Sequence, residues 1–564
     1  MLLLAKALLT SFLFTPFLLI GCESSNENKD NCYERKTGAP IDGIRIAWDY
    51  SSMQQLAPKG GYPRLLRLAD QSIVVVSEDY EGSSFLIRSH DEGKSWSAPL
   101  DIFPKSTISN TIVHKANPEI IQLKNGDILV ACNYRPVIEE RTPFAIAIRK
   151  SKDNGVTWSD EKVIYEAQPR FKDGCWEPSF LQLPDGEIQI YFANEAKFTH
   201  SDEQEISMIS SNDNGENWAT VKIISFRAGR RDGMPVARLI NDEIVLVIED
   251  NNVDRFKPYT VRCKIADNWS SPILGDSPNR EYALENKIPD NIYLGAPYLL
   301  VLPSGETVIS YQTNENRKSD WELSTMEVAV GDKTARKFTK RSQPYLITLS
   351  EQAKWNSLAL WDNNTIVALA SADIKNGTIS PWLIKGYILS DIQISRKEIT
   401  AYPLFVGSQN DTNAKAGIGA DGNNIYIQCI VSDPTPVPAD PSNQEGDGVY
   451  LYIDAENLSL EAPDKGIYKI WCSDQGEQKF WEGNCGQWEK SSIQGIKINN
   501  QKTNEGYILD FIIPRKNISN LMRSTLRLGL ALSNYSTPHN GIVEQIVHGT
   551  DFSSKTWIKV EIKP

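Results

Sequence analysis

The stretch EPSFLQLPDGEIQIYFAN, from Glu177 to Asn194, determines the fold class of this chain. It contains a proline, an apolar strand, a tight turn at Asp185 and Gly186, and a second apolar strand, which together predict a β-hairpin. The pattern recurs at near-equal spacing in five further copies, the last of them degenerate, which begin at Tyr62, Asn117, Met234, Ala296 and Trp355.

The length of each repeat fits four short strands. Four-stranded sheets repeated about a central axis form a β-propeller. We therefore predict an all-β chain in which residues 42–388 form a six-bladed propeller. Residues 389–564 break the repeat, and we predict that they form a separate β-sandwich.

A second motif, S-x-D-x-G-x-x-W, supports the propeller. It occurs after three of the hairpins, as Ser89–Trp96, Ser151–Trp158 and Ser211–Trp218, and ADNW at Ala266–Trp269 resembles a remnant of it. The aspartate can cap backbone N–H groups of a turn, the glycine can adopt an unusual φ, and the tryptophan can pack against the blade. These motifs resemble the Asp-boxes of sialidase-like propellers, whose role is structural.

Two carboxylates are expected at one end of the propeller. In each hairpin the first strand begins and the second strand ends at the same edge, so Glu177 and Glu249 should lie at the end opposite the Asp-Gly turns. Glycoside hydrolysis typically uses two carboxylates, one as the acid and one as the nucleophile or base. The alternative is that both glutamates are solvated loop acids or salt-bridge partners.

Three segments resemble glycoside hydrolase family 93: GYPRLLRL, WEPSFLQLPDGEIQIYFANE, and DGMPVARL followed by VLVIED. The resemblance covers most of residues 60–320. It implies a six-bladed exo-α-L-arabinanase that releases arabinose units from the non-reducing end of arabinan, with Glu177 as the general acid/base and Glu249 as the nucleophile of a retaining reaction. No cofactor is expected. Predicted substrate-binding residues near this end are Tyr62, Arg64, Asn117, Trp176, Asp250 and Tyr311.

The implied mechanism requires Glu177 to be protonated near neutral pH and Glu249 to be ionised. Arg64 or Arg238 could keep Glu249 ionised, or both arginines could form salt bridges between blades. The sugar stays open, since L-arabinofuranosides, D-arabinofuranosides and galactofuranosides need the same two acids, and so does the choice between a monosaccharide and a disaccharide product.

Two other functions remain open. An exo-α-sialidase would share the Asp-boxes, with Arg64 as a first arginine and Tyr311 as a candidate nucleophile, but no convincing second and third arginine open the later blades. A non-catalytic glycan-binding propeller would not need two acids at the same end.

The C-terminal segments GDGVYLYIDAEN and NEGYILDFIIPRKNI alternate apolar and polar residues and resemble family 9 carbohydrate-binding modules. Trp471, Trp481 and Trp488 could stack on sugar rings or serve in packing. Structural calcium occurs in related modules, and the acids Asp433, Asp447 and Asp454 do not place an ion. Cys472 and Cys485 could pair or remain buried thiols.

The N-terminal segment MLLLAKALLTSFLFTPFLLIGC predicts a secretory signal over residues 1–22. Its LLIGC end resembles a bacterial lipoprotein processing site, which implies lipidation of Cys22, a flexible tether over residues 23–41, and anchoring at the outer membrane, facing the cell surface. An ordinary signal peptide is the alternative. The net charge of −13, with no basic stripe, argues against a nucleic-acid partner. We expect a monomer whose partners are a polysaccharide or oligosaccharide substrate and, through the lipid, a membrane.

Overall fold

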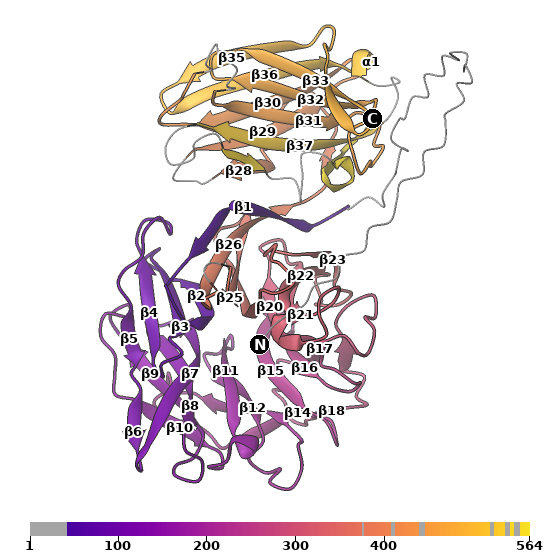
Figure 1. Cartoon of the computed structure of the whole chain (residues 1–564). Helices are drawn as coiled ribbons and strands as arrows, with labels where there is room; N and C mark the ends of the chain where they lie inside the picture. The colour runs from indigo at the N-terminus through magenta and orange to yellow at the C-terminus, as the bar shows by residue number, and fades with distance from the viewer. Residues whose placement is uncertain are drawn as a thin grey trace, which may run out of the picture.

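The computed structural model describes residues 42–374, 377–407, 412–438, 446–518, 524–535, 542–545 and 553–563. It confirms an all-β chain with six sheets arranged around an axis, followed by a β-sandwich (Figure 1). Cys22 and the proposed tether lie outside the described residues. No helix in the described part of the chain is long and apolar enough to cross a membrane.

Each blade is built on an antiparallel meander of four strands, to which β6 is added in blade 2 and a parallel strand, β18, in blade 3. Blade 1 consists of β2 (Gly61–Arg67), β3 (Ile73–Glu78), β4 (Ser84–Ser89) and β5 (Leu100–Phe103). Blade 2 consists of β6 (Ser106–Ile108), β7 (Thr111–Gln122), β8 (Ile128–Pro136), β9 (Ala145–Ser151) and β10 (Lys162–Glu166). Blade 3 consists of β11 (Cys175–Gln182), β12 (Ile188–Asn194), β13 (Glu205–Ser211), β14 (Lys222–Phe226) and the parallel β18 (Ile273–Leu274).

The remaining three blades follow the same plan. Blade 4 consists of β15 (Asp232–Ile240), β16 (Glu243–Asp250), β17 (Lys257–Lys264) and β19 (Arg280–Tyr282). Blade 5 consists of β20 (Leu294–Val301), β21 (Thr307–Thr313), β22 (Thr325–Gly331) and β23 (Thr339–Ser342). Blade 6 consists of β24 (Ala353–Leu360), β25 (Thr365–Ala372), β26 (Ser380–Leu389) and the N-terminal β1 (Arg45–Gln55). Short 3-10 turns, η1 (Phe171–Asp173) and η2 (Trp321–Leu323), lie in connections.

The propeller is closed by strand β1, which comes from the N-terminal end of the described chain. It pairs antiparallel with β26, beginning with Arg45 opposite Leu389, so blade 6 is built from both ends of the propeller. The innermost strands β2, β7, β11, β15, β20 and β24 each contact the next around the ring, and β24 contacts β2.

Every innermost strand carries a β-bulge at the same position. Its first residue has a left-handed φ between 48° and 59° in all six blades; these residues, which we call the bulge ring, are Tyr62, Asn117, Glu177, Met234, Ala296 and Trp355. A proline follows in five of the six, which fits because bulges tolerate the missing N–H. The recurring proline therefore marks the bulge, two residues inside the strand in the case of Glu177, rather than the start of the strand.

The three Asp-boxes form the turns after β4, β9 and β13. Asp91 accepts hydrogen bonds from the Ser89 hydroxyl (2.8 Å) and the Ser95 amide (2.9 Å), and Asp153 and Asp213 repeat the arrangement. These hydrogen bonds, led by that from the Ser95 hydroxyl, lower the pKa of Asp91 to about 2. The glycines of the three boxes have φ between 77° and 84°. The motif is thus a structural turn, as predicted.

The C-terminal domain packs two sheets face to face. The larger sheet contains β27 (Ile392–Ile394), β31 (Gly448–Asp454), β32 (Ile467–Ser473), β33 (Gln478–Asn484), β34 (Gln487–Lys490), β37 (Thr525–Asn534), β38 (Ile542–Gln545) and β39 (Ile558–Ile562). The smaller sheet contains β28 (Leu404–Gly407), β29 (Asn413–Ala420), β30 (Asn424–Ser432), β35 (Lys497–Thr503) and β36 (Gly506–Pro514). One helical turn, α1 (Arg515–Ile518), and η3 (Ser554–Thr556) complete it.

The two domains share a core where β1 and β26 lie between them in Figure 1. Ala47, Tyr387 and Leu389 of blade 6 belong to the same cluster of buried residues as the sandwich interior. The Tyr387 hydroxyl accepts a hydrogen bond from the Gly407 amide (3.0 Å) and donates one to the Gly407 carbonyl (2.9 Å). The sandwich is therefore packed onto the blade that closes the propeller.

Candidate active site

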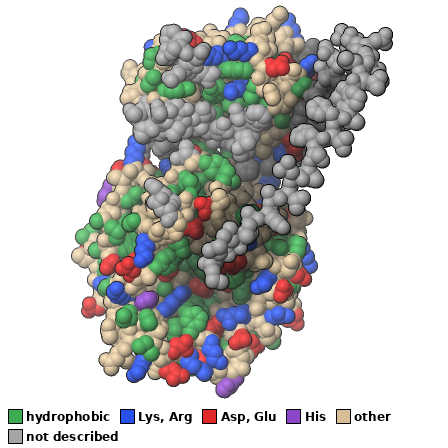
Figure 2. Space-filling view, in the orientation of Figure 1, with side chains coloured by type: hydrophobic (Ala, Val, Ile, Leu, Met, Phe, Trp, Pro, Cys, Tyr) green, Lys and Arg blue, Asp and Glu red, His purple; other side chains and the backbone are tan. Residues whose placement is uncertain are grey.

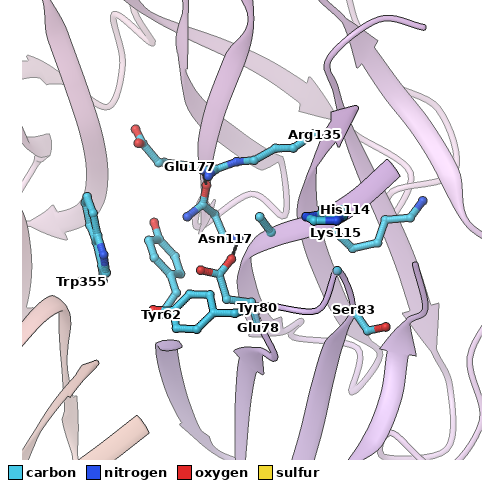
Figure 3. A pocket seen from close by; sticks show the side chains of 12 residues that line it. Tyr62, Glu78, Tyr80, Ser83, His114, Lys115, Asn117, Arg135, Glu177 and Trp355 are labelled. Atoms are coloured by element: carbon cyan, nitrogen blue, oxygen red, sulfur yellow. Dashed lines mark hydrogen bonds between the residues drawn. The ribbon is translucent and has the colours of Figure 1, made fainter. Parts of the chain in front are cut away.

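A small cavity opens at the end of the propeller where the bulge ring lies. Its volume is about 270 Å³. Figure 3 shows the labelled side chains around it, and in Figure 2 the face of the propeller is hollowed near its centre with acidic side chains in the hollow. Lining residues are Tyr62, Glu78, Tyr80, Gly82, Ser83, His114, Lys115, Ala116, Asn117, Arg135, Glu177 and Trp355. The bulge-ring members Tyr62, Met234 and Ala296 pack together with Trp355, so two of the lining side chains, Tyr62 and Trp355, belong to an apolar cluster.

Glu177 projects from the bulge of β11 into this cavity (Figure 3). Its carboxylate accepts a hydrogen bond from the Met234 amide of blade 4 at 3.2 Å. Burial raises the pKa of Glu177, while the charge of Arg135 opposes that increase. A raised pKa is the property that a general acid needs near neutral pH.

Glu249 is the penultimate residue of β16 and lies beside this cavity rather than in its lining. Its Oε2 accepts a hydrogen bond from the Ala296 amide of blade 5 at 2.7 Å. A Cβ atom on Gly295 would lie 2.7 Å from that oxygen and would also overlap the Tyr293 hydroxyl, so the close approach of these two side chains requires a glycine. Burial and then the charge of Glu177 raise the pKa of Glu249 to about 8.

The structure thus brings Glu177 and Glu249 together, as the hairpin geometry predicted. It does not keep Glu249 ionised in the way the implied mechanism requires, because burial and then the charge of Glu177 raise its pKa. Two interacting carboxyl groups lose their protons in steps that belong to the pair. Next to an ionised Glu177, Glu249 keeps its proton up to about pH 8.

Two arginines other than the expected ones act on this pair. Arg231 forms an ion pair with Glu195 and lowers the pKa of both Glu177 and Glu249. Burial raises the pKa of Glu195 to about 7 despite that ion pair. Arg135 lies closer to Glu177 and donates hydrogen bonds to Asn117 and, at 2.7 Å, to Asn133.

The two arginines expected to act on Glu249, Arg64 and Arg238, lie next to Glu119 instead. Arg64 is buried, its guanidinium stacks 3.7 Å from the centre of the Tyr62 ring, and its Nε pairs with Glu119 at 3.2 Å. Arg238 also acts on Glu119. The salt-bridge interpretation of these arginines therefore holds for Arg64, which bridges blades 1 and 2. The charge of Arg64 also lowers the pKa of Glu177, but neither Arg64 nor Arg238 shifts that of Glu249.

The other predicted substrate-binding residues divide into two groups. Tyr62 and Asn117 line the cavity. Asp250 is buried and pairs with Arg280 at 2.7 Å, and Tyr311 is buried and donates a hydrogen bond to Glu327 at 2.9 Å, so neither reaches the cavity. Trp176 is almost fully buried, and its ring lies 5.1 Å from that of Phe144. We do not assign a substrate contact to Asp250 or Tyr311.

An aromatic wall that the sequence analysis did not identify stands beside the two glutamates. We use this name for Tyr293, Trp321 and Trp355, whose ring centres are 5.6 and 6.3 Å apart in that order. Trp355 occupies the same repeat position as Glu177, so the register of the sixth hairpin could have predicted its place. Tyr293 and Trp321 lie outside the hairpin template, and no repeat signal marks them.

The C-terminal candidates also separate. Trp471 is fully buried in the sandwich core, whereas Trp481 and Trp488 are partly buried against it.

Cys472 is a buried free thiol, so a pair with Cys485 is not formed. Asp433 is close enough to Asp447 and Asp474 for their charges to raise its pKa, after burial, to about 6, while Asp454 caps a turn at Leu458 and Ser459. No group of three or more acids, histidines or cysteines in the described ranges has the arrangement to hold a metal ion.

Comparison with known families agrees with this architecture. Residues 65–284 match the BNR repeat-like domain, and residues 393–561 match the carbohydrate family 9 binding domain-like family. No curated protein matches the chain.

Solved structures with similar folds are distant in sequence. The α-L-arabinofuranosidase of glycoside hydrolase family 93 from Fusarium graminearum, in complex with arabinobiose, is 16% identical, with 63% of this chain and 98% of that chain covered and a TM-score of 0.43. A Hadza microbial sialidase is 12% identical, with 59% and 66% covered and a TM-score of 0.42. A family 9 carbohydrate-binding module from Caldicellulosiruptor kristjanssonii, in complex with cellotriose, is 12% identical, with 31% and 94% covered and a TM-score of 0.25. The chain therefore combines a BNR repeat-like propeller with a carbohydrate family 9 binding-domain-like sandwich.

Proposed function

We propose that the protein is an exo-acting retaining glycoside hydrolase that cleaves α-arabinofuranosyl linkages at the non-reducing end of arabinan or arabino-oligosaccharides. The observation that carries this proposal is the meeting of Glu177 and Glu249, two carboxylates with raised pKa values, at the closed end of the propeller. Burying two acids without a fixed cationic partner for each disfavours the folded state, so a purely structural role would not select them.

The shape and charge of the cavity support a neutral chain end as the substrate. A volume of about 270 Å³, with Tyr62 and Trp355 of the lining packed in an apolar cluster, suits a terminal sugar better than the middle of a polymer. Of its cations, Lys115 is already paired with Glu161 at 2.8 Å, and Arg135 faces both Glu78 and Glu177. An anionic sugar would meet two carboxylates in this lining, and the charges of Lys115 and Arg135 already act on carboxylates of the protein.

In the proposed reaction Glu177 donates its proton to the leaving glycosidic oxygen while Glu249 attacks the anomeric carbon. A water molecule, deprotonated by Glu177, then hydrolyses the glycosyl-enzyme. The first step needs one proton on the pair, which is the state that mutual repulsion favours over full ionisation. In the second step Glu249 is esterified, and the ionised Glu177 takes the proton of the water. The aromatic wall gives the sugar an apolar surface beside Glu249.

The shared proton predicts the pH profile. We expect kcat/KM for an arabinofuranoside to fall above about pH 8, because the pair then loses its last proton. Glu177→Gln removes the neighbouring charge and should lower the pKa of Glu249, which would then feel Arg231 and the Ala296 amide without that opposition. With a dinitrophenyl arabinofuranoside, whose leaving group needs no acid, kcat/KM of this variant should rise with pH below pH 8 and should not fall above it. A pH profile unchanged from the wild type would contradict the effect of the Glu177 charge on Glu249.

A sialidase is the second candidate, and one observation favours it. The Tyr293 hydroxyl and the Glu249 carboxylate both lie against Gly295, which resembles the tyrosine and glutamate pair of sialidases. Arg135 is the only arginine that lines the cavity in the described residues, whereas sialidases hold the substrate carboxylate with three. A non-catalytic glycan-binding propeller would also use this cavity but would release no product.

The test is a comparison of products. Purified protein should release arabinose or arabinobiose from linear arabinan and should shorten the chain stepwise from its non-reducing end. It should leave sialyl-lactose intact. Release of sialic acid would select the sialidase, and binding without any product would select the glycan-binding protein. D-arabinofuranosides and galactofuranosides belong in the same panel, because the two acids do not distinguish these sugars.

We also propose that Cys22 carries a lipid that anchors the protein at the outer membrane, and that the C-terminal domain binds carbohydrate. The second part is supported by the family 9 match. Trp481 and Trp488 are the tryptophans left partly exposed for that role.

A further inference from the structure

Comparison of equivalent positions in the six blades distinguishes acids with a structural role from acids with a functional role at the end that carries Glu177 and Glu249. The residue just before each bulge pairs with one residue of the next strand in the same blade. We call the place of that partner the brace position. Its residues in blades 1 to 6 are Glu78, Asn133, Ala193, Glu249, Gln312 and Ser371.

In four blades the brace side chain holds the next blade in place by accepting a hydrogen bond from the amide of its bulge-ring residue. Gln312 accepts from Trp355 at 2.7 Å and Ser371 from Tyr62 at 2.8 Å. Glu78 accepts from Asn117 at 3.0 Å in the same way. Neutral side chains therefore perform the bracing, and the task does not require a carboxylate.

Only Glu78 and Glu249 place a charge at the brace position, and burial raises the pKa of both. Glu249 is already assigned to the proposed reaction. Glu78 lines the cavity on the same wall as Asn117 and Arg135 (Figure 3), and its charge is left without an assigned role.

The hydrogen-bonding capacity left at this wall fits a hydroxyl group. Among the described residues, Oε1 of Glu78 has no donor and Nη1 of Arg135 has no acceptor. Oε2 of Glu78 is held by the Asn117 amide, and the rest of the Arg135 guanidinium by the side chains of Asn117 and Asn133. An unused acceptor beside an unused donor is matched by a neutral hydroxyl pair, in which one group donates and its neighbour accepts. An anionic ligand would satisfy Arg135 but would be repelled by Glu78.

We propose that Glu78 and Arg135 form a specificity subsite that binds two neighbouring hydroxyl groups of the terminal neutral sugar. The inference rests on the proposed function for its catalytic readout. Fixing both hydroxyls at this wall directs the anomeric carbon toward Glu177 and Glu249, so the subsite selects the sugar by the positions of its hydroxyls.

The test is Glu78→Gln, which retains an amide oxygen as the brace, as Gln312 does in blade 5, and removes only the charge. Melting temperature should stay at the wild-type value, while kcat/KM for 4-nitrophenyl α-L-arabinofuranoside should fall roughly 10- to 100-fold, as expected for loss of a charged hydrogen bond. On the deoxy analogue that lacks the bound hydroxyl, the kcat/KM values of wild type and variant should agree within about twofold, since the interaction is absent from both. Undiminished activity of the variant on the parent substrate, or an equal loss on every analogue, would overturn the proposal.

Binding measurements separate this inference from the proposed hydrolysis. Titration of wild type and Glu78→Gln with L-arabinose, D-arabinose and D-galactose, followed by tryptophan fluorescence, uses Trp355 in the cavity as the reporter. If the wild type cleaves nothing but binds one of these sugars, and the variant binds it at least about tenfold more weakly, the subsite stands and the hydrolase proposal fails. Absence of both cleavage and binding for all these sugars would overturn the subsite.

Discussion

Glu249→Gln should abolish cleavage of both arabinan and activated aryl arabinofuranosides, by about 10⁴-fold or more, because no glycosyl-enzyme can form without the nucleophile. The glutamine substitution is chosen because Glu249 also accepts the Ala296 amide hydrogen bond. An alanine would leave that buried donor unpaired, at a loss of about 1–3 kcal/mol of stability, and would mix a folding defect with a catalytic one. Kinetics and a thermal melt of the same preparation measure both.

Glu177→Ala should give a different signature. A sugar alkoxide must be protonated as it leaves, whereas dinitrophenolate leaves without help, so this variant should lose about 10²- to 10⁴-fold on arabinan and still form the glycosyl-enzyme from a dinitrophenyl glycoside. Azide needs no general base and should speed turnover of that intermediate. Wild-type cleavage of arabinan by either variant would remove the assignment of the pair.

The position of this pair followed from the sequence because hairpin geometry determines which strand ends meet. Glu177 near the start of one strand and Glu249 near the end of another had to lie at the edge opposite the turns. The residues next to them show the limit of that reasoning. Successive side chains in a strand point to opposite faces, so Asp250 and Tyr311, each adjacent in sequence to a brace residue, point into the blades and away from the axis.

The bulge ring and the aromatic wall were harder to predict from the sequence. No glycine marks the left-handed φ at Tyr62, Glu177 or Trp355. The proline that follows Tyr62 and Glu177 indicated an irregularity there, but none follows Trp355. Tyr293 and Trp321 come from connections between strands, where tertiary packing rather than periodicity sets the position of a side chain. The raised pKa of Glu249 likewise depends on burial and on Glu177, which only the assembled ring provides.

The junction between the domains departs from the expectation of a separate sandwich in one respect. Strand β1 both closes blade 6 and contributes Ala47 to the core of the C-terminal domain, and β26 contributes Tyr387 and Leu389. Arg45 of β1 is buried and donates a hydrogen bond to the Thr556 carbonyl at 3.0 Å. A shared core of this kind couples the unfolding of two domains, so thermal denaturation of the full chain should show one transition.

Tyr387→Ala should break that coupling. It removes a ring that is 3% exposed together with its hydrogen bonds to Gly407, a loss of about 3–5 kcal/mol concentrated at the junction. We expect calorimetry to show two transitions in place of one, with the propeller melting first because β1 is no longer held. Tyr345→Ala is the matched control, since Tyr345 is equally buried and donates hydrogen bonds to the carbonyls of Ala368 and Trp382, but lies inside the propeller. The control should lower the melting temperature by a similar amount without splitting the transition. Two transitions in the wild type would mean that the sandwich is an independent module. A single transition in both variants would mean that the coupling does not depend on Tyr387.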